Sequence, residues 1–531
     1  MAATAPPLRP VGRVTPPFER AAGKSGARLV SPLTILALVI HGYHPYAEDG
    51  GLYLAGVKSV LHPELYPYFR GFTTAHLRFS LFAPMVAGLV RASHLSLMGM
   101  MLFLYVASIW ATLLAAWQIA IRCFRSREAC VGAVTLLALL LTVPVAGTSL
   151  MLMDPYVSAR SISTPCSLFA LVAVTDIGRQ IRQEERISIR SLLLCCGSLL
   201  LAALVHPLMA ADALGCALVL AAAGLMNGKW QWVAYAGVCV TGLAAAALLI
   251  RFALPCPPGY MEIARTRSYW FLSSWHWYEL LGLAAPLLVL AAIRFRLPNI
   301  HSGAFKWIAQ MAIFVGCLSV LVAVTFARVD MSTYAVARLQ PLRVFQTVYV
   351  ITIVSVGAAV GEFVLRRSTW RRVAMIAGVG ITMLFVQIGA FANSAHFEFP
   401  WAAPANDWER AFTWIRNNTP EDALIALDAD YINAPGEDSH NFRAIAERSA
   451  VPDYSKDGGI ASIASDLTAD WFAGEKVQKG LDRATDAERI HAPRAFRVDW
   501  VVLSSGAITG FACDYANHAA KVCRVPARVR P

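Results

Sequence analysis

Long runs of hydrophobic residues alternate with short polar stretches over the first three quarters of the chain. An α-helix needs about 20 consecutive, mostly apolar residues to cross the hydrocarbon core of a bilayer. The pattern predicts a polytopic α-helical membrane protein with about 11 transmembrane helices. The eleven segments are residues 29–46, 95–121, 129–152, 161–178, 191–206, 208–226, 231–252, 277–293, 307–327, 344–365 and 373–392.

The fifth and sixth segments meet at His206-Pro207 with almost no polar residues between them. One interpretation is a single long helix that is kinked by the proline, which removes a backbone hydrogen bond. However, the combined run from Ser191 to Met226 has 36 residues, about twice what one crossing needs. The length therefore favours two crossings.

The loop of residues 47–94 is predicted to carry structure of its own. Apolar positions recur at helical spacing over Gly51–Leu61, which predicts an amphipathic helix that lies on the membrane surface. The apolar run Phe79–Val90 is too short to span a bilayer and predicts a second interfacial helix.

Residues 393–531 are more polar and predict a separate soluble domain. Ala423–Leu427 and Trp500–Leu503 are short apolar runs that indicate buried strands, and Asp407–Asn417 has the pattern of a helix. We therefore expect a small C-terminal α/β domain after a transmembrane part that covers residues 29–392.

The distribution of positive charge predicts the orientation of the chain in the membrane. With a cytoplasmic N-terminus, the inner segments carry 20 Lys and Arg residues and the outer loops carry 11. Cytoplasmic loops are enriched in these residues, so the count favours an N-terminus inside and, after eleven crossings, a C-terminal domain outside the inner (plasma) membrane. Residues 1–28 are rich in Pro and Arg without an apolar core, which predicts a disordered cytoplasmic leader.

Composition excludes one class of partner. The 531-residue chain is 57% hydrophobic and only 15% charged, whereas soluble proteins average about 25% charged residues. Its net charge of +12 divides into −5 for residues 393–531 and +17 for the remainder. The basic excess therefore belongs to the membrane part, where topology and anionic lipids explain it, and a nucleic-acid partner is not expected.

Two of the eleven cysteines, Cys513 and Cys523, flank a short polar stretch in the predicted outer domain. An oxidising compartment favours a local disulfide between them, and two free thiols are the alternative. Most of the other cysteines lie in or beside hydrophobic segments and are expected to be small core residues.

The acidic pair Glu48-Asp49 follows the first hydrophobic segment directly. Ionisable groups at the membrane boundary need a partner or a function, and two close carboxylates resist double ionisation. A solvated loop, or a cap for the helix that begins near Gly51, explains the pair equally well. The turn after the third segment presents one carboxylate, Asp154, and one guanidinium, Arg160. Asp154 can also be a helix cap.

This arrangement resembles the GT-C superfamily of polytopic membrane glycosyltransferases. The resemblance lies in an acidic residue early in a long first outer loop, in the stretch YAEDGGLYLA at residues 46–55, and in a second acidic position, Asp154. The stretch WIRNNTP at residues 414–420 looks like the opening of an outer domain in such enzymes. The chain departs from the family in having no Asp-x-Asp in either outer loop, and it lacks the Trp-Trp-Asp-Tyr-Gly signature of oligosaccharyltransferases.

The resemblance implies transfer of a sugar from a polyprenyl-linked donor to a glycan, lipid or protein acceptor on the outer face. Such transfer needs a base for the acceptor hydroxyl, for which Asp49 is the candidate, with Glu48 tuning it or pointing away. It also needs cations at the departing phosphate, for which the candidates are Arg343, Arg338 and Arg160. Snorkelling of these arginines to lipid headgroups is the alternative. A divalent cation, Mg²⁺ or Mn²⁺, held by Asp154 is an open option.

Three further ionisable residues are candidates for a role in the same chemistry. His206 and Asp212 lie in apolar sequence, where ionisable side chains are functional candidates, and a packed pair is the alternative. His76 in the first outer loop is the third. Two other classes of function remain open: a transporter or flippase of a lipid-linked or charged solute, and a non-catalytic protein of envelope assembly.

Overall fold

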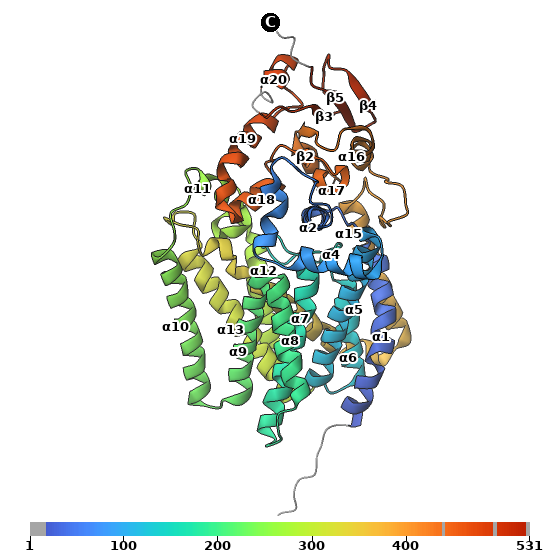
Figure 1. Cartoon of the computed structure of the whole chain (residues 1–531). Coiled ribbons are helices and arrows are strands. Elements are labelled where there is room, and N and C mark those ends of the chain that lie inside the picture. The colour runs from blue at the N-terminus through green and yellow to red at the C-terminus, as the bar shows by residue number, and fades with distance from the viewer. Residues whose placement is uncertain (1–16, 438–440, 492–495, 527–531) are drawn as a thin grey trace, which may run out of the picture.

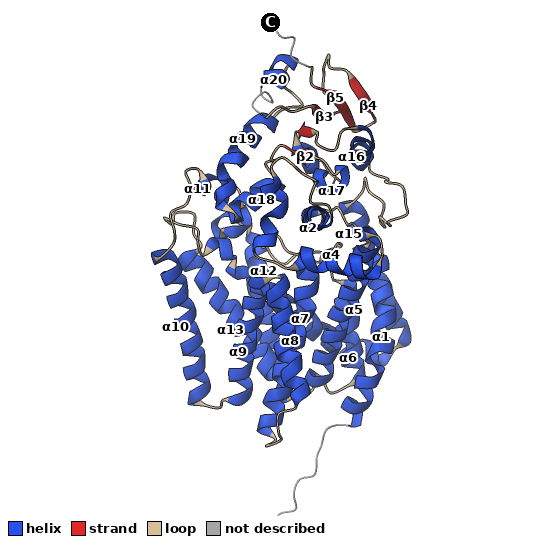
Figure 2. Ribbon diagram, viewed as in Figure 1, coloured by secondary structure: helices blue, strands red, loops and turns tan. Residues whose placement is uncertain are grey.

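The structure is a computed structural model and describes residues 17–437, 441–491 and 496–526. Long helices lie side by side in a bundle, and a smaller domain that contains all the described strands covers one end of it (Figures 1 and 2). Two helices from residues 47–94, α2 (Glu48–Leu61) and α4 (Phe82–Ser93), lie between the bundle and this domain (Figure 1). The fold is thus mostly helical with a small C-terminal sheet domain.

Each of the eleven hydrophobic segments overlaps a helix. The helices are α1 (Pro17–His41), α5 (Leu97–Cys123), α6 (Arg127–Leu139), α7 (Ala159–Arg182), α8 (Ile189–Val205), α9 (Pro207–Leu225), α10 (Lys229–Arg251), α12 (Trp277–Arg296), α13 (Gly303–Phe326), α14 (Phe345–Phe363) and α15 (Thr369–Ala390).

Eight of the described helices are long and apolar enough to cross a membrane, which makes the chain a multi-pass membrane protein. They are α5, α7, α9, α10, α12, α13, the segment Ala337–Phe363 that contains α14, and α15. The apolar part of α1 and the whole of α6 and α8 are shorter. The number of eleven crossings therefore stays a prediction.

Residues 191–226 form two helices, as their length predicted. Helix α8 ends at Val205 and α9 begins at Pro207, where proline is well accommodated because the first amide of a helix needs no intrahelical partner. The two helices pack against each other and both pack against α7. His206 therefore lies at a reversal of the chain.

Two expectations about the bundle need correction. The third segment was predicted to be helical to residue 152, but α6 ends at Leu139 and residues 140–158 are irregular. Pro144 explains the early end, since proline disfavours helical geometry in the residue before it and has no amide to donate.

The predicted disordered leader is also corrected in part. Residues 17–28 belong to α1, which starts at a proline, a residue common at the first helical position. The rest of the expected leader, residues 1–16, lies outside the described residues.

Residues 47–94 contain α2 (Glu48–Leu61), α3 (Arg70–Thr74) and α4 (Phe82–Ser93), so both predicted helices are present. However, α2 does not lie on a membrane surface, because every residue from Gly50 to Ser59 is buried. It packs against α4 and against α17 (Phe442–Ala446) of the C-terminal domain. A short apolar helix that is covered from two directions buries its polar face as well.

The C-terminal domain is built on a five-stranded sheet with strand order β2-β1-β3-β5-β4. The predicted strands are confirmed as β1 (Leu424–Leu427) and β3 (Trp500–Ser504), which pair in parallel. The remaining strands are β2 (Ser449–Ala450), parallel to β1, and β4 (Cys513–Ala516) and β5 (Ala520–Arg524), which are antiparallel to their neighbours.

Side chains of β1 alternate between two buried faces, as the period of a strand requires. Ile425 and Leu427 belong to a buried hydrophobic cluster that includes residues of α16 (Asp407–Asn418). Leu424 and Ala426 belong to a second cluster, which includes Val477 of α19 (Thr468–Gln478). The domain is completed by α18 (Lys456–Ile463) and α20 (Asp486–His491), and α11 (Tyr260–Arg265) from the bundle packs against α18.

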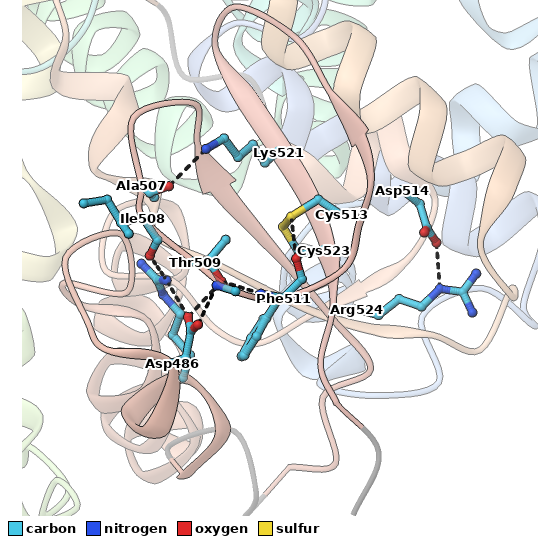
Figure 3. The surroundings of a disulfide bond; sticks show 12 residues. Asp486, Ala507, Ile508, Thr509, Phe511, Cys513, Asp514, Lys521, Cys523 and Arg524 are labelled. Atoms are coloured by element: carbon cyan, nitrogen blue, oxygen red, sulfur yellow. Dashed lines mark hydrogen bonds and ion pairs between the residues drawn. A yellow bond between two sulfur atoms is a disulfide. The ribbon is translucent and has the colours of Figure 1, made fainter.

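A disulfide joins Cys513 in β4 to Cys523 in β5 (Figure 3). Next to it, Arg524 Nε donates to Asp514 Oδ2 at 2.6 Å, and Lys521 Nζ donates to the Ala507 carbonyl at 3.1 Å. The two strands are thus linked by covalent and polar contacts at the edge of the sheet.

Candidate active site

One buried arginine joins two carboxylates that are far apart in sequence. Arg160 donates from Nη1 to Asp49 Oδ2 at 3.0 Å, and from Nη2 and Nε to Asp154 Oδ2 at 2.8 and 3.1 Å. The side chains of Arg160 and Asp154 are 6% and 7% exposed, whereas that of Asp49 is 39% exposed. The structure therefore brings together three of the predicted site residues and leaves Asp49 as the accessible one.

Local sequence around the start of α7 explains the position of Arg160. The Ser158 amide donates to Ser161 Oγ at 3.1 Å, which satisfies an amide at the helix terminus that has no intrahelical partner. Ser158 Oγ also donates to Asp154 Oδ2 at 3.4 Å. Arg160 consequently lies in the first turn of α7, with its guanidinium turned back to the residues that precede the helix.

Asp49 reaches Arg160 from the first turn of α2, where a negative charge also suits the helix dipole. The two glycines that follow it are required by close packing. A side chain at Gly50 would meet the Pro45 carbonyl oxygen at 2.6 Å and the Tyr156 ring at 3.0 Å, and one at Gly51 would collide with Asn441. Asp49 therefore bonds Arg160 from the start of α2, a helix that has no side-chain cap at its N-terminus among the described residues.

Glu48 points to a different partner from Asp49. It forms an ion pair with Lys456 of α18, in the C-terminal domain. Two further ion pairs join residues 47–94 to that domain: Lys58 with Glu447 at 2.6 Å, and Arg78 with Asp466 at 2.8 Å. These contacts fix α2, and hence Asp49, between bundle and domain.

The two carboxylates differ in their protonation behaviour. Burial alone would raise the pKa of Asp49, but the positive charges of Arg160 and Lys456 outweigh it and hold this pKa well below its ordinary value. Burial raises the pKa of Asp154 in spite of Arg160, and the negative charge of Asp49 adds to the rise. Asp49 is thus ionised at neutral pH.

His76 lies beside this group. Its ring stacks on Tyr53 at 5.1 Å between centroids, and its Nε2 is buried with no partner among the described residues. Burial lowers the pKa of His76 although Asp49 opposes the shift, so its imidazole is neutral at pH 7. His76 and Tyr53 line a mostly apolar cavity of ≈ 240 Å³, a volume that includes its part open to solvent.

Arg343 faces the same group from the start of the α14 segment. Its guanidinium is within electrostatic range of Arg160, Asp49 and Tyr53, and its Nε donates to Gln340 Oε1 at 2.7 Å. Burial raises the pKa of Tyr53 to about 12, an effect that the charges of Arg160 and Arg343 oppose. Arg343 is therefore a second cation at the site that no described carboxylate pairs directly.

The remaining predicted residues take different places. His206 is within electrostatic range of Arg343, Arg160 and His76. Asp212 has a buried Oδ2 without a described partner, and Arg343 is the charge that acts on it. Arg338 is instead within electrostatic range of Tyr260 in α11.

No group of three or more His, Cys, Asp or Glu side chains within the described residues could hold a metal ion. Asp154 makes its contacts to Arg160 and Ser158. Sequence reasoning missed Tyr53, Tyr156 and Lys456. Tyr53 could have been found, because it lies four residues after Asp49 and hence on the same face of a helix. Lys456 gave no signal, since it comes from a distant domain.

Comparison with known proteins gives a limited result. No protein-family profile matches the chain, and no curated protein matches it. Among solved structures, the chain is similar to the archaeal oligosaccharyltransferase AglB from Archaeoglobus fulgidus, in complex with an inhibitory peptide and a dolichol-phosphate. The TM-score is 0.42 and the identity is 12%, over 92% of this chain and 70% of that one. AglB has a GT-C fold; a similarity of this size identifies no equivalent residues.

Proposed function

We propose that the chain is a glycosyltransferase that moves a sugar from a polyprenyl-phosphate or polyprenyl-pyrophosphate donor to an acceptor hydroxyl. The observation that carries the proposal is the buried Arg160, which holds Asp49 and Asp154 together at the junction of a membrane bundle and a polar domain. Such a junction is where a lipid-borne donor and a water-borne acceptor can meet.

Asp49 is the proposed general base, since it is ionised and accessible. Arg160 bonds only its Oδ2, and no hydrogen bond to Oδ1 is found among the described residues, so Oδ1 can accept from an acceptor hydroxyl. A low pKa makes a carboxylate a weak base. However, the buried Arg160 holds Asp49 in a fixed position while the proton of the acceptor hydroxyl moves onto it.

Arg343 is the proposed cation for the departing phosphate. It lies within electrostatic range of Asp49 and Arg160, no described carboxylate pairs with it, and the planar guanidinium suits phosphate oxygens. The mostly apolar cavity beside Tyr53 and His76 offers a wall for the first prenyl units. The prediction that Arg160 or Arg338 binds phosphate stays a prediction, because their described contacts go elsewhere.

The proposed setting is the inner (plasma) membrane, with the C-terminal domain on the outer side. The bias of Lys and Arg toward the predicted cytoplasmic segments supports this orientation, as does the Cys513–Cys523 disulfide, which is expected in an oxidising compartment.

Binding of a short-chain polyprenyl phosphate tests the donor site without knowledge of the sugar. In native mass spectrometry of the detergent-solubilised chain, wild type should bind the lipid and Arg343→Gln should bind it at least tenfold more weakly. Arg328→Gln, which removes an exposed arginine at the end of α13, is the matched control and should bind as wild type does. Equal binding by wild type and Arg343→Gln would remove Arg343 from the site.

A further inference from the structure

The C-terminal domain has a second cavity, apart from the one beside His76. It lies at the carboxyl ends of the parallel strands β1 and β2, which is where α/β sheets commonly bind ligands. Its volume, including the part open to solvent, is ≈ 380 Å³. Its polar lining residues are Tyr431, Asn441, Arg443, Asp453, Ser455 and Lys456.

Arg443 in this lining has an unsatisfied donor. Its side chain is 4% exposed, and its two Nη atoms donate to both oxygens of Asp457 at 2.8 and 2.9 Å and to the Ala450 carbonyl at 2.9 Å. Its Nε is buried and has no partner among the described residues. Buried donors are almost always satisfied, so an orphaned one at a cavity wall indicates a bound molecule.

The charges of the lining favour an uncharged ligand. Arg443 is neutralised by Asp457, and Lys456 is paired with Glu48. Asp453 contributes a carboxyl group whose Oδ1 accepts the Lys456 amide at 2.7 Å. The cavity therefore offers hydrogen-bonding groups but no excess of positive charge for a phosphate.

The ring of Tyr431 adds an apolar surface to these polar groups. It stacks on Trp408 at 4.0 Å between centroids with 21° between the planes, so its orientation is fixed. A rigid aromatic face beside carboxyl, amide and hydroxyl groups matches a sugar ring, which has apolar C–H faces and a rim of hydroxyls.

The cavity adjoins the proposed active site through two of its lining residues. Lys456 pairs with Glu48, and Asn441 packs against Gly51, so both touch the first turn of α2, which carries Asp49. A molecule in the cavity thus lies against the element that holds the proposed base.

We propose that this cavity binds a saccharide unit of the acceptor, next to the unit whose hydroxyl reacts. This inference rests on the proposed function and deepens it, because it makes the acceptor a glycan rather than a protein or a simple lipid. The domain then selects the acceptor, while the bundle holds the donor.

Saturation-transfer NMR on the detergent-solubilised chain tests the proposal, with a panel of methyl glycosides of common hexoses and pentoses as probes. Wild type should show saturable binding of at least one glycoside. Ser455→Val fills the cavity and Asp453→Asn removes a carboxylate while keeping an acceptor oxygen; each should weaken that binding at least tenfold. Asp470→Asn, an exposed change in the same domain, should leave it unaltered.

Two results would overturn the proposal: no saturable binding of any panel member by wild type, or equal binding by wild type and both cavity variants that remain folded. Asp49→Asn should keep glycoside binding while losing transfer. If no glycoside binds, the cavity proposal fails, but the transfer assay still tests the role of Asp49. If Asp49→Asn is fully active, Asp49 is not the base, but the binding result for the cavity still stands.

Discussion

Arg160 organises the site at the scale of single residues, because it lowers the pKa of one carboxylate and fixes the position of two. A lysine could not replace it, since one ammonium group cannot present the planar set of donors that reaches Asp49 and Asp154 together. The neutral His76 and the cationic Arg343 border the same space from two other elements. The chemistry of the site therefore depends on side chains from four separate segments.

Arg160→Gln should shift the pH dependence of transfer. With Arg160 present, the pKa of Asp49 is low, so the base stays ionised and activity falls only at strongly acidic pH. Without the arginine this pKa should rise by about 1–3 units, which moves the acidic limb of the pH–rate profile to higher pH. An unchanged acidic limb in a folded Arg160→Gln variant would mean that Arg160 does not control the base.

At the scale of elements, α2 is the part whose packing decides whether Asp49 reaches Arg160. It is buried over Gly50–Ser59 and is held by α4 on one side and α17 on the other. The glycines at its start allow this contact, because a side chain at Gly51 has no room beside Asn441.

Gly51→Ala should therefore destabilise the contact between α2 and the C-terminal domain by about 1–3 kcal/mol, the usual cost of overpacking. Thermal unfolding of the solubilised protein measures this as a lower midpoint. The matched control is Gly88→Ala in α4, where an added Cβ meets nothing within 4 Å and the better helix propensity of alanine should leave stability equal or higher. Equal midpoints for the two variants would show that α2 is not tightly packed.

The elements themselves were largely predictable from local pattern, because hydrophobic runs, strand-like runs and a proline at a chain reversal are local signals. Helices α8 and α9 and strands β1 and β3 were found in this way. The burial of α2 was not, since it depends on a domain about 390 residues further along the chain, as the pair Lys58–Glu447 shows. The turn of Arg338 toward Tyr260 was missed for the same reason.

At the scale of the whole molecule, the account requires the sheet domain and the site to face the outer side of the membrane. Cys256 is exposed on the segment that leads to α11, which packs against the domain. Glu185 is exposed in the turn between α7 and α8, where the chain is predicted to be cytoplasmic.

A membrane-impermeant maleimide should then label Cys256 in intact cells or right-side-out vesicles. In a Cys256→Ser background, Glu185→Cys should be labelled only in inverted vesicles. The reverse pattern would place the domain and the site in the cytoplasm and would contradict the proposed orientation.

The most direct test of the central claim is the rate of sugar transfer by Asp49→Asn in folded, membrane-inserted protein with a polyprenyl-linked donor. Loss of a general base typically costs about 10²–10⁴-fold, so the account predicts a fall of that size. Glu64→Gln, which changes an exposed acidic residue in the loop after α2, is the control and should transfer sugar at the wild-type rate. Transfer by Asp49→Asn at a rate close to wild type would contradict the account.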